Sequence, residues 1–167
     1  MSAITIRLGL VGSGAYVFWW ETDTIAFEQL CRQQMTLVSS FKNHPTEWSN
    51  MTNPYHEANR KSWNSATERH QSHRPDLIEQ ISSGYNTLYA EDMALLGDVR
   101  GKSVVHLQCN NGLDTLSISK HLGASITGVD ISDYAIEVAR QLSDACAIPA
   151  RFVRSDIFDW FDTTEDR

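Results

Sequence analysis

Residues 103–112 read SVVHLQCNNG and residues 125–130 read SITGVD, and these two stretches decide the fold. Each opens with a short apolar or β-branched run, typical of a strand buried on both faces, and each ends in turn-forming or acidic residues. Residues 151–154, RFVR, form a third such run. Helical patterns fill the gaps, from Asp114 to Leu122 and from Ser132 or Asp133 to about Ala147. This alternation predicts an α/β fold, a partial doubly wound parallel sheet with flanking helices.

The chain before this unit divides in two. Residues 51–100 predict a helical lead-in or lid, with helices over 55–69, 76–82 and 90–96. Residues 1–50 show no clear periodicity beyond a candidate helix over 24–38, and Met51 opens a stretch that reads like a protein start. We therefore expect residues 1–50 to be an extension, from a start that is not the native one, which the domain does not need. Residues 101–167 are then the first βαβαβ part of the domain.

Candidate site residues follow the three predicted strands at their carboxyl ends, where ligands bind in open parallel sheets. The first turn needs positive φ, which Gly112 adopts freely and Asn110 tolerates. Asp130 follows Gly112 at an offset close to that of carboxylates that bind both hydroxyls of a ribose. Asp156 could accept a hydrogen bond from the exocyclic amine of adenine, with Ile157 packed on the ring. The plainer interpretations are a helix-capping strand end for Asp130 and a surface carboxylate for Asp156.

These residues resemble a known family. Residues 104–112, VVHLQCNNG, followed by Gly128-Val129-Asp130 and Ser155-Asp156-Ile157, resemble the class I S-adenosylmethionine-dependent methyltransferases, which have a Rossmann-like fold. The resemblance runs from about Met51 to the end of the chain. It implies S-adenosylmethionine as cofactor and a small molecule as methyl acceptor, with no catalytic base assigned. The implied cofactor site consists of Gln108, Cys109, Asn110, Gly112, Asp130, Ile131, Asp156 and Ile157.

The chain departs from the family pattern in the first motif and in length. His106 stands where the family has an acidic residue, and Gln108 and Asn110 stand where it has glycines. We expect His106 to be a hydrogen-bonded core or pocket-floor residue and Cys109 to act as a small buried hydrophobe rather than a nucleophile. The family sheet has seven strands, whereas this chain offers three, so the resemblance implies an incomplete copy. Residues 160–167 would then be a loop, with Trp160 and Phe161 left without core partners.

An incomplete sheet has an open edge. On this interpretation the strand over 103–107 lacks its neighbour on one side, and we expect self-association through that edge and no methyltransferase activity. Two alternatives stay open. One is a non-catalytic fragment or interaction module that keeps the adenosine-binding loops. The other is a nicotinamide-dependent enzyme, against which the incomplete Gly-x-Gly-x-x-Gly pattern counts.

Composition excludes several other classes. The chain has 14 Lys and Arg against 21 Asp and Glu, a net charge of −7, which argues against a nucleic-acid partner. The apolar run over residues 8–20 is too short to span a membrane. The glycines of residues 9–15, GLVGSGA, imitate a phosphate loop without its Lys. Three scattered cysteines, and His70 with His73 alone, indicate neither disulfides nor a metal site, so we expect a cytoplasmic protein without a metal.

Overall fold

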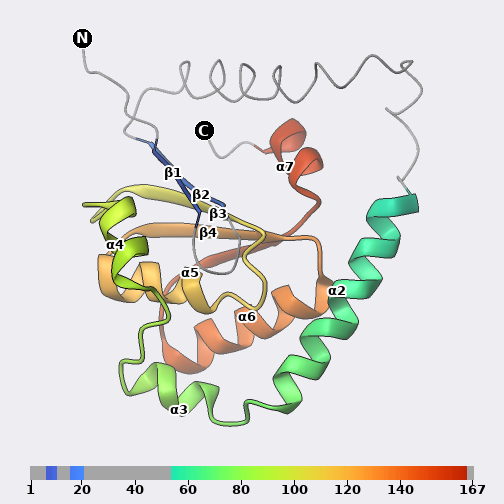
Figure 1. The fold of residues 1–167 in the computed structure, drawn as a ribbon, viewed down its shortest axis with the longest axis horizontal. Coiled ribbons are helices and arrows are strands. Elements are labelled where there is room, and N and C mark those ends of the chain that lie inside the picture. Colours follow the sequence, from blue (N-terminus) through green and yellow to red (C-terminus); the bar gives the residue numbers. More distant parts are fainter. Residues whose placement is uncertain (1–6, 11–15, 21–53, 165–167) are drawn as a thin grey trace.

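The computed structural model describes residues 7–10, 16–20 and 54–164, and side chains are described over 54–164 (Figure 1). Two strands come first, and the helices and strands of the main unit follow Pro54. In chain order the elements are β1 (Arg7–Leu10), β2 (Tyr16–Trp20), α2 (Pro54–Ser72), α3 (Leu77–Ser82), α4 (Ala90–Leu96), β3 (Ser103–Leu107), α5 (Leu113–Ser117), the π-helical turn η1 (Ile118–Leu122), β4 (Ser125–Asp130), α6 (Asp133–Cys146), β5 (Arg151–Arg154) and α7 (Ile157–Thr163).

The strands form one sheet in the order β1-β2-β3-β4-β5. Strands β3, β4 and β5 are parallel, with Leu107 opposite Val129 and Val129 opposite Val153. Strand β2 pairs antiparallel with both β1 and β3. The predicted α/β class and the partial Rossmann-like unit of three parallel strands are confirmed.

Helices cover both faces of the parallel strands (Figure 1). On one face, α4 and η1 pack with β3 and β4 in a core that includes Val104, Ile118 and Ile126, while α3, α5 and α6 share a second core with Phe152 of β5. On the other face, α7 packs on β3 and β4. Because β3 and β4 are buried on both sides, their ends are held firmly, and the loops that leave them have fixed positions.

The end of the described chain is a helix, not the predicted loop. Trp160 in α7 is 3% exposed and packs with Val105, Leu107 and Val129. Its ring meets that of Phe161 edge to face, with centroids 5.2 Å apart. The prediction that Trp160 and Phe161 lack partners is therefore wrong, because the capping Asp156 starts a helix that folds them back onto the sheet.

The edge of β3 is also occupied. Strand β2 lies along its whole length, with Tyr16 opposite Leu107 and Trp20 opposite Ser103. The prediction of an open edge at residues 103–107 is wrong, because the β-branched and aromatic run YVFWW supplies the missing neighbour. The candidate helix over 24–38 and the expected boundary at Met51 lie outside the described residues.

Of the described helices, none combines the length and the apolar character that crossing a membrane would need.

Candidate functional site

A pocket of about 380 Å³ lies where β3, β4 and β5 end, and α2 closes its outer side. Six of the eight predicted site residues line it, from three loops that are far apart in the sequence. Those six are Gln108, Asn110, Asp130, Ile131, Asp156 and Ile157. The structure thus brings the loops together at the edge of the sheet where the sequence places them.

Asp130 is the buried acidic group of this pocket. Its side chain is 8% exposed, and burial raises the pKa of its carboxyl group, while hydrogen bonds from backbone N–H groups act in the opposite direction. The N–H of Asn110 donates to Oδ2 and the N–H of Ser132 donates to Oδ1, each at 2.8 Å. Each carboxylate oxygen has a further lone pair, so a held and oriented Asp130 keeps capacity to accept hydrogen bonds from a ligand.

The turn between β3 and α5 places three residues at positive φ: Gln108 at 57°, Asn110 at 51° and Gly112 at 78°. Gly112 stands at the cap position of α5, and Asp114, at which the predicted helix begins, accepts a hydrogen bond from the Thr87 hydroxyl. A Cβ on Gly112 would lie 2.7 Å from the Phe152 ring and 2.8 Å from Ala139 Cβ. The glycine is therefore needed for close packing of the turn on β5 and α6, and it does not line the pocket.

Cys109 also faces the core. Its thiol is 4% exposed, and a Cβ on Gly128 would come within 2.9 Å of its Sγ. Burial and the nearby Asp130 raise the pKa of the thiol well above its ordinary value, so it stays protonated and is a poor nucleophile. The interpretation as a small buried hydrophobe fits this environment. The Cys109 side chain does not line the pocket, which disagrees with its predicted place in the cofactor site.

Asp156 has two partners of different kinds. Its Oδ1 accepts a hydrogen bond from the N–H of Phe158 at 2.9 Å, which caps α7. Its Oδ2 lies 3.0 Å from Nδ1 of His56, in the first turn of α2. Asp156 is thus both a structural cap and a pocket-lining acceptor, and the two roles use different oxygens.

Four residues of α2 line the pocket that the predicted site did not include: His56, Asn59, Trp63 and Thr67. Their spacing of three, four and four places them on one face of a helix, which is the signal in the sequence that could have identified them. Trp63 lines the pocket and is 46% exposed.

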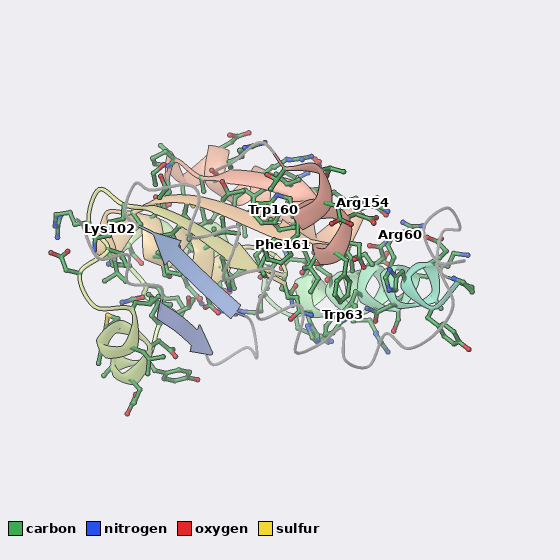
Figure 2. All side chains as sticks on the ribbon, turned by 90° about the horizontal axis from the view of Figure 1, so that it is seen from above. Arg60, Trp63, Lys102, Arg154, Trp160 and Phe161 are labelled. Atoms are coloured by element: carbon green, nitrogen blue, oxygen red, sulfur yellow. The ribbon has the colours of Figure 1, made fainter. Side chains whose placement is uncertain are left out.

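Polar contacts fix α2 against the start of α6. Arg60 pairs with Asp133 and Glu57, and Arg154 of β5 reaches the same Asp133 at 3.0 Å (Figure 2). The Oδ1 atom of Asn64 accepts hydrogen bonds from the Ser132 hydroxyl at 2.6 Å and from the N–H of Tyr134 at 3.3 Å. Since Ser132 also contacts Asp130, this network ties the wall of the pocket to its buried carboxylate.

His106 lies in the core below the turn. It is 1% exposed, and its Nδ1 is 2.8 Å from the Thr115 hydroxyl. Burial lowers the pKa of its imidazole to about 4, so it is neutral near pH 7. The expected hydrogen-bonded core histidine is what the structure shows.

In the part of the chain that the structure describes, no group of three or more His, Cys, Asp or Glu side chains is placed to hold a metal ion.

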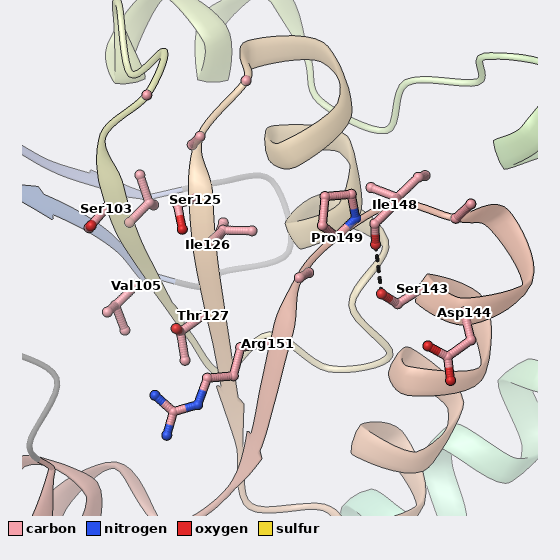
Figure 3. Close-up of a pocket in the computed structure, with 16 residues that line it drawn as sticks. Ser103, Val105, Ser125, Ile126, Thr127, Ser143, Asp144, Ile148, Pro149 and Arg151 are labelled. Carbon is pink, nitrogen blue, oxygen red and sulfur yellow. Dashed lines mark hydrogen bonds between the residues drawn. The ribbon is translucent and has the colours of Figure 1, made fainter.

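A second, larger pocket of about 1070 Å³ lies at the opposite end of the strands (Figure 3). Arg151, Thr127 and Ser125 line it along neighbouring strands, with Asp144 and Pro149 at one side. It contains none of the predicted site residues, and its walls come from the starts of the strands.

Comparison with known proteins finds partial similarities to this chain. The chain is 32% identical over 74 residues to a protein assigned as a protein N5-glutamine methyltransferase of Methanocaldococcus jannaschii, a match that covers 42% of this chain and 38% of that protein. It therefore spans less than half the length of this relative. A solved structure from work on the conversion of a disulfide bond into a thioacetal group in echinomycin biosynthesis is 36% identical, over 38% of this chain and 27% of that chain, with a TM-score of 0.33. No protein-family model matches the chain. The similarity to the first protein agrees with the resemblance to methyltransferases over the 74 residues that it covers.

Proposed function

We propose that the chain binds S-adenosylmethionine in the pocket at the carboxyl ends of β3, β4 and β5, and that it serves methyl transfer to a small molecule. The observation that carries the proposal is the pair of carboxylates, Asp130 and Asp156, on one pocket with Ile131 and Ile157 beside them. An adenosine has hydrogen-bond donors on the ribose and on the exocyclic amine of the base, and an apolar ring face between them. The two carboxylates and the two isoleucines of the pocket are complementary to these groups.

The charge of the pocket favours this cofactor over a dinucleotide. No Lys or Arg stands among the described residues that line it, and two carboxylates do. A pyrophosphate would meet like charge there, whereas the sulfonium and amino groups of S-adenosylmethionine bring positive charge. The nicotinamide alternative is disfavoured by the same observation.

The residues of the chain would act by positioning. S-adenosylmethionine supplies an activated methyl group, and holding it in line with an acceptor is worth about 7–11 kcal/mol in well-oriented reactions. Asp130, fixed by the N–H groups of Asn110 and Ser132, would orient the ribose. Asp156, fixed as the cap of α7, would orient the base. The apolar side chains of Ile131 and Ile157 would exclude water from the ring.

Calorimetric titration with S-adenosylhomocysteine and with NAD tests the proposal. We expect the chain to bind the first and not the second, and Asp130→Ala to weaken binding by about 10-fold or more, because hydrogen bonds to a charged acceptor contribute about 1.5–3 kcal/mol each. Asp144→Ala is the matched control, since Asp144 lines the other pocket. A folded chain that binds neither ligand would favour the non-catalytic interaction module, and equal affinity in Asp130→Ala would remove that residue from the site.

A further inference from the structure

His56 makes two contacts that together resemble those of a purine base. Its Nδ1 lies 3.0 Å from Asp156 Oδ2, and since an ionised carboxylate only accepts, the imidazole N–H is the donor. Its ring lies at 17° to the ring of Phe158, stacked with centroids 6.2 Å apart. A planar nitrogen heterocycle thus donates to Asp156 beside an aromatic ring.

One oxygen of Asp156 caps α7, and the other is paired with a side chain of the pocket wall. The Oδ1 atom serves as the cap of α7 through its hydrogen bond with the N–H of Phe158. The Oδ2 atom is therefore the natural acceptor for an exocyclic amine, and it is the atom that His56 occupies.

We infer that His56 stands in the place of the base and competes with an incoming aminopurine for Asp156 Oδ2. The inference rests on the proposed adenosine site. The His56 side chain is 40% exposed and lies in the first turn of α2, so it can rotate away without disturbing the core. Arg60 and Asn64 hold α2 against Asp133 one and two turns later, so the helix itself stays in place.

This competition favours one class of base. A ligand must replace the N–H that His56 gives to Asp156, because a partly buried acceptor left unpaired is unfavourable. A 6-aminopurine supplies that donor, whereas a 6-oxopurine presents an acceptor to the carboxylate. The site therefore selects adenosine over inosine, and His56 enforces the selection by holding Asp156 until a donor replaces it.

The test is calorimetry with S-adenosylhomocysteine, adenosine and inosine on the natural chain, His56→Ala and His70→Ala. His70 is an exposed histidine in the last turn of the same helix and is the matched control. We expect His56→Ala to tighten the binding of S-adenosylhomocysteine and adenosine about fivefold, with His70→Ala unchanged. Inosine should bind more weakly than adenosine in every variant, with its largest disadvantage in the natural chain.

The two hypotheses fail differently. If the natural chain binds S-adenosylhomocysteine and folded His56→Ala shows equal or weaker affinity, His56 is an ordinary wall residue and the inference is overturned while the proposed function stands. If neither chain binds any adenosine ligand, with thermal unfolding showing that both are folded, the proposed function is wrong and the inference falls with it.

Discussion

The two ends of the parallel strands present pockets of opposite character. At the starting end the groove measures about 1070 Å³, and at the carboxyl end the pocket measures about 380 Å³. The smaller one is lined by the buried Asp130 and by Gln108 and Asn110, whose backbones have positive φ, and its α2 wall is anchored by ion pairs. Sheet topology, rather than the volume of a pocket, therefore decides where we place the proposed site, because the loops that leave parallel strands converge at their carboxyl ends.

Removing the N-terminal strands should have the largest effect, because it exposes one edge of β3 along its whole length. A chain that starts at Met51 lacks β2, and the backbone of β3 from Ser103 to Leu107 then loses its antiparallel partner. We expect a lower thermal midpoint and self-association, seen by light scattering during size exclusion. A monomer with the midpoint of the full chain would instead support the expectation that residues 1–50 are dispensable.

A pair of glycines compares the two ends directly. Gly112 and Gly101 have similar positive φ, 78° and 72°, but a Cβ on Gly112 would collide with Phe152 while one on Gly101 would meet nothing within 4 Å. Gly112→Ala should lower the free energy of unfolding by about 3–4 kcal/mol, and Gly101→Ala by about 1 kcal/mol. Chemical denaturation of the two variants measures both. Equal losses would mean that backbone strain, not packing, sets the need for glycine.

The loss of folding stability at low pH should depend on His106, which lies in the core near the carboxyl ends of the strands. Burial holds the pKa of His106 at about 4, against about 6.5 in an unfolded chain. Between these values the unfolded state takes up the proton, so stability falls as pH falls through this window, by about 3 kcal/mol in all. His106→Gln should remove most of that dependence in denaturation curves at pH 7 and pH 4. The raised pKa of Asp130 acts with the opposite sign, so an unchanged curve in His106→Gln would show that other groups dominate.

The smallest expected effect concerns the anchoring of the pocket wall. Asn64→Ala removes hydrogen bonds to Ser132 and Tyr134, which join α2 to the start of α6. We expect S-adenosylhomocysteine affinity to fall about fivefold, equivalent to about 1 kcal/mol. Gln141→Ala, which breaks an exposed side-chain contact with Glu137 in the same α6, is the control and should change nothing. No change in Asn64→Ala would mean that Arg60 alone holds the helix.

The parallel unit was readable from the sequence because its signals are local. Strand β3 and helix α4 have the predicted bounds, and the ends of β4 and β5 carry the predicted carboxylates. Pairing of β2 with β3 was not readable, since a strand does not encode its partner across a long separation in the chain. The sequence likewise did not show which residues of the turn pack and which form hydrogen bonds. The packing of Gly112 against Phe152 and the hydrogen bond of Asp114 with Thr87 depend on neighbours that only the folded chain supplies.

The pocket wall on α2 was missed for another reason. Residues at positions 56, 59, 63 and 67 are polar or aromatic and lie in a largely polar helix, so no apolar stripe marked that face. The resemblance concerns the ends of the strands and not this helix. The contact between His56 and Asp156 joins residues a hundred positions apart. Such a pair follows from how α2 docks on α6, which the pattern of one helix cannot specify.

The order of the strands across the sheet has a consequence for the route by which the chain folds. Strands β3, β4 and β5 are joined by short crossovers, so their contacts can form early. The hairpin of β1 and β2 is synthesised first, yet about 80 residues separate β2 from β3, and that loop is entropically slower to close. An isolated hairpin is only marginally stable in water. Strands β1 and β2, which are synthesised first, would therefore join the sheet last. In a nascent chain the edge of β3 would stay uncovered until the parallel strands have formed.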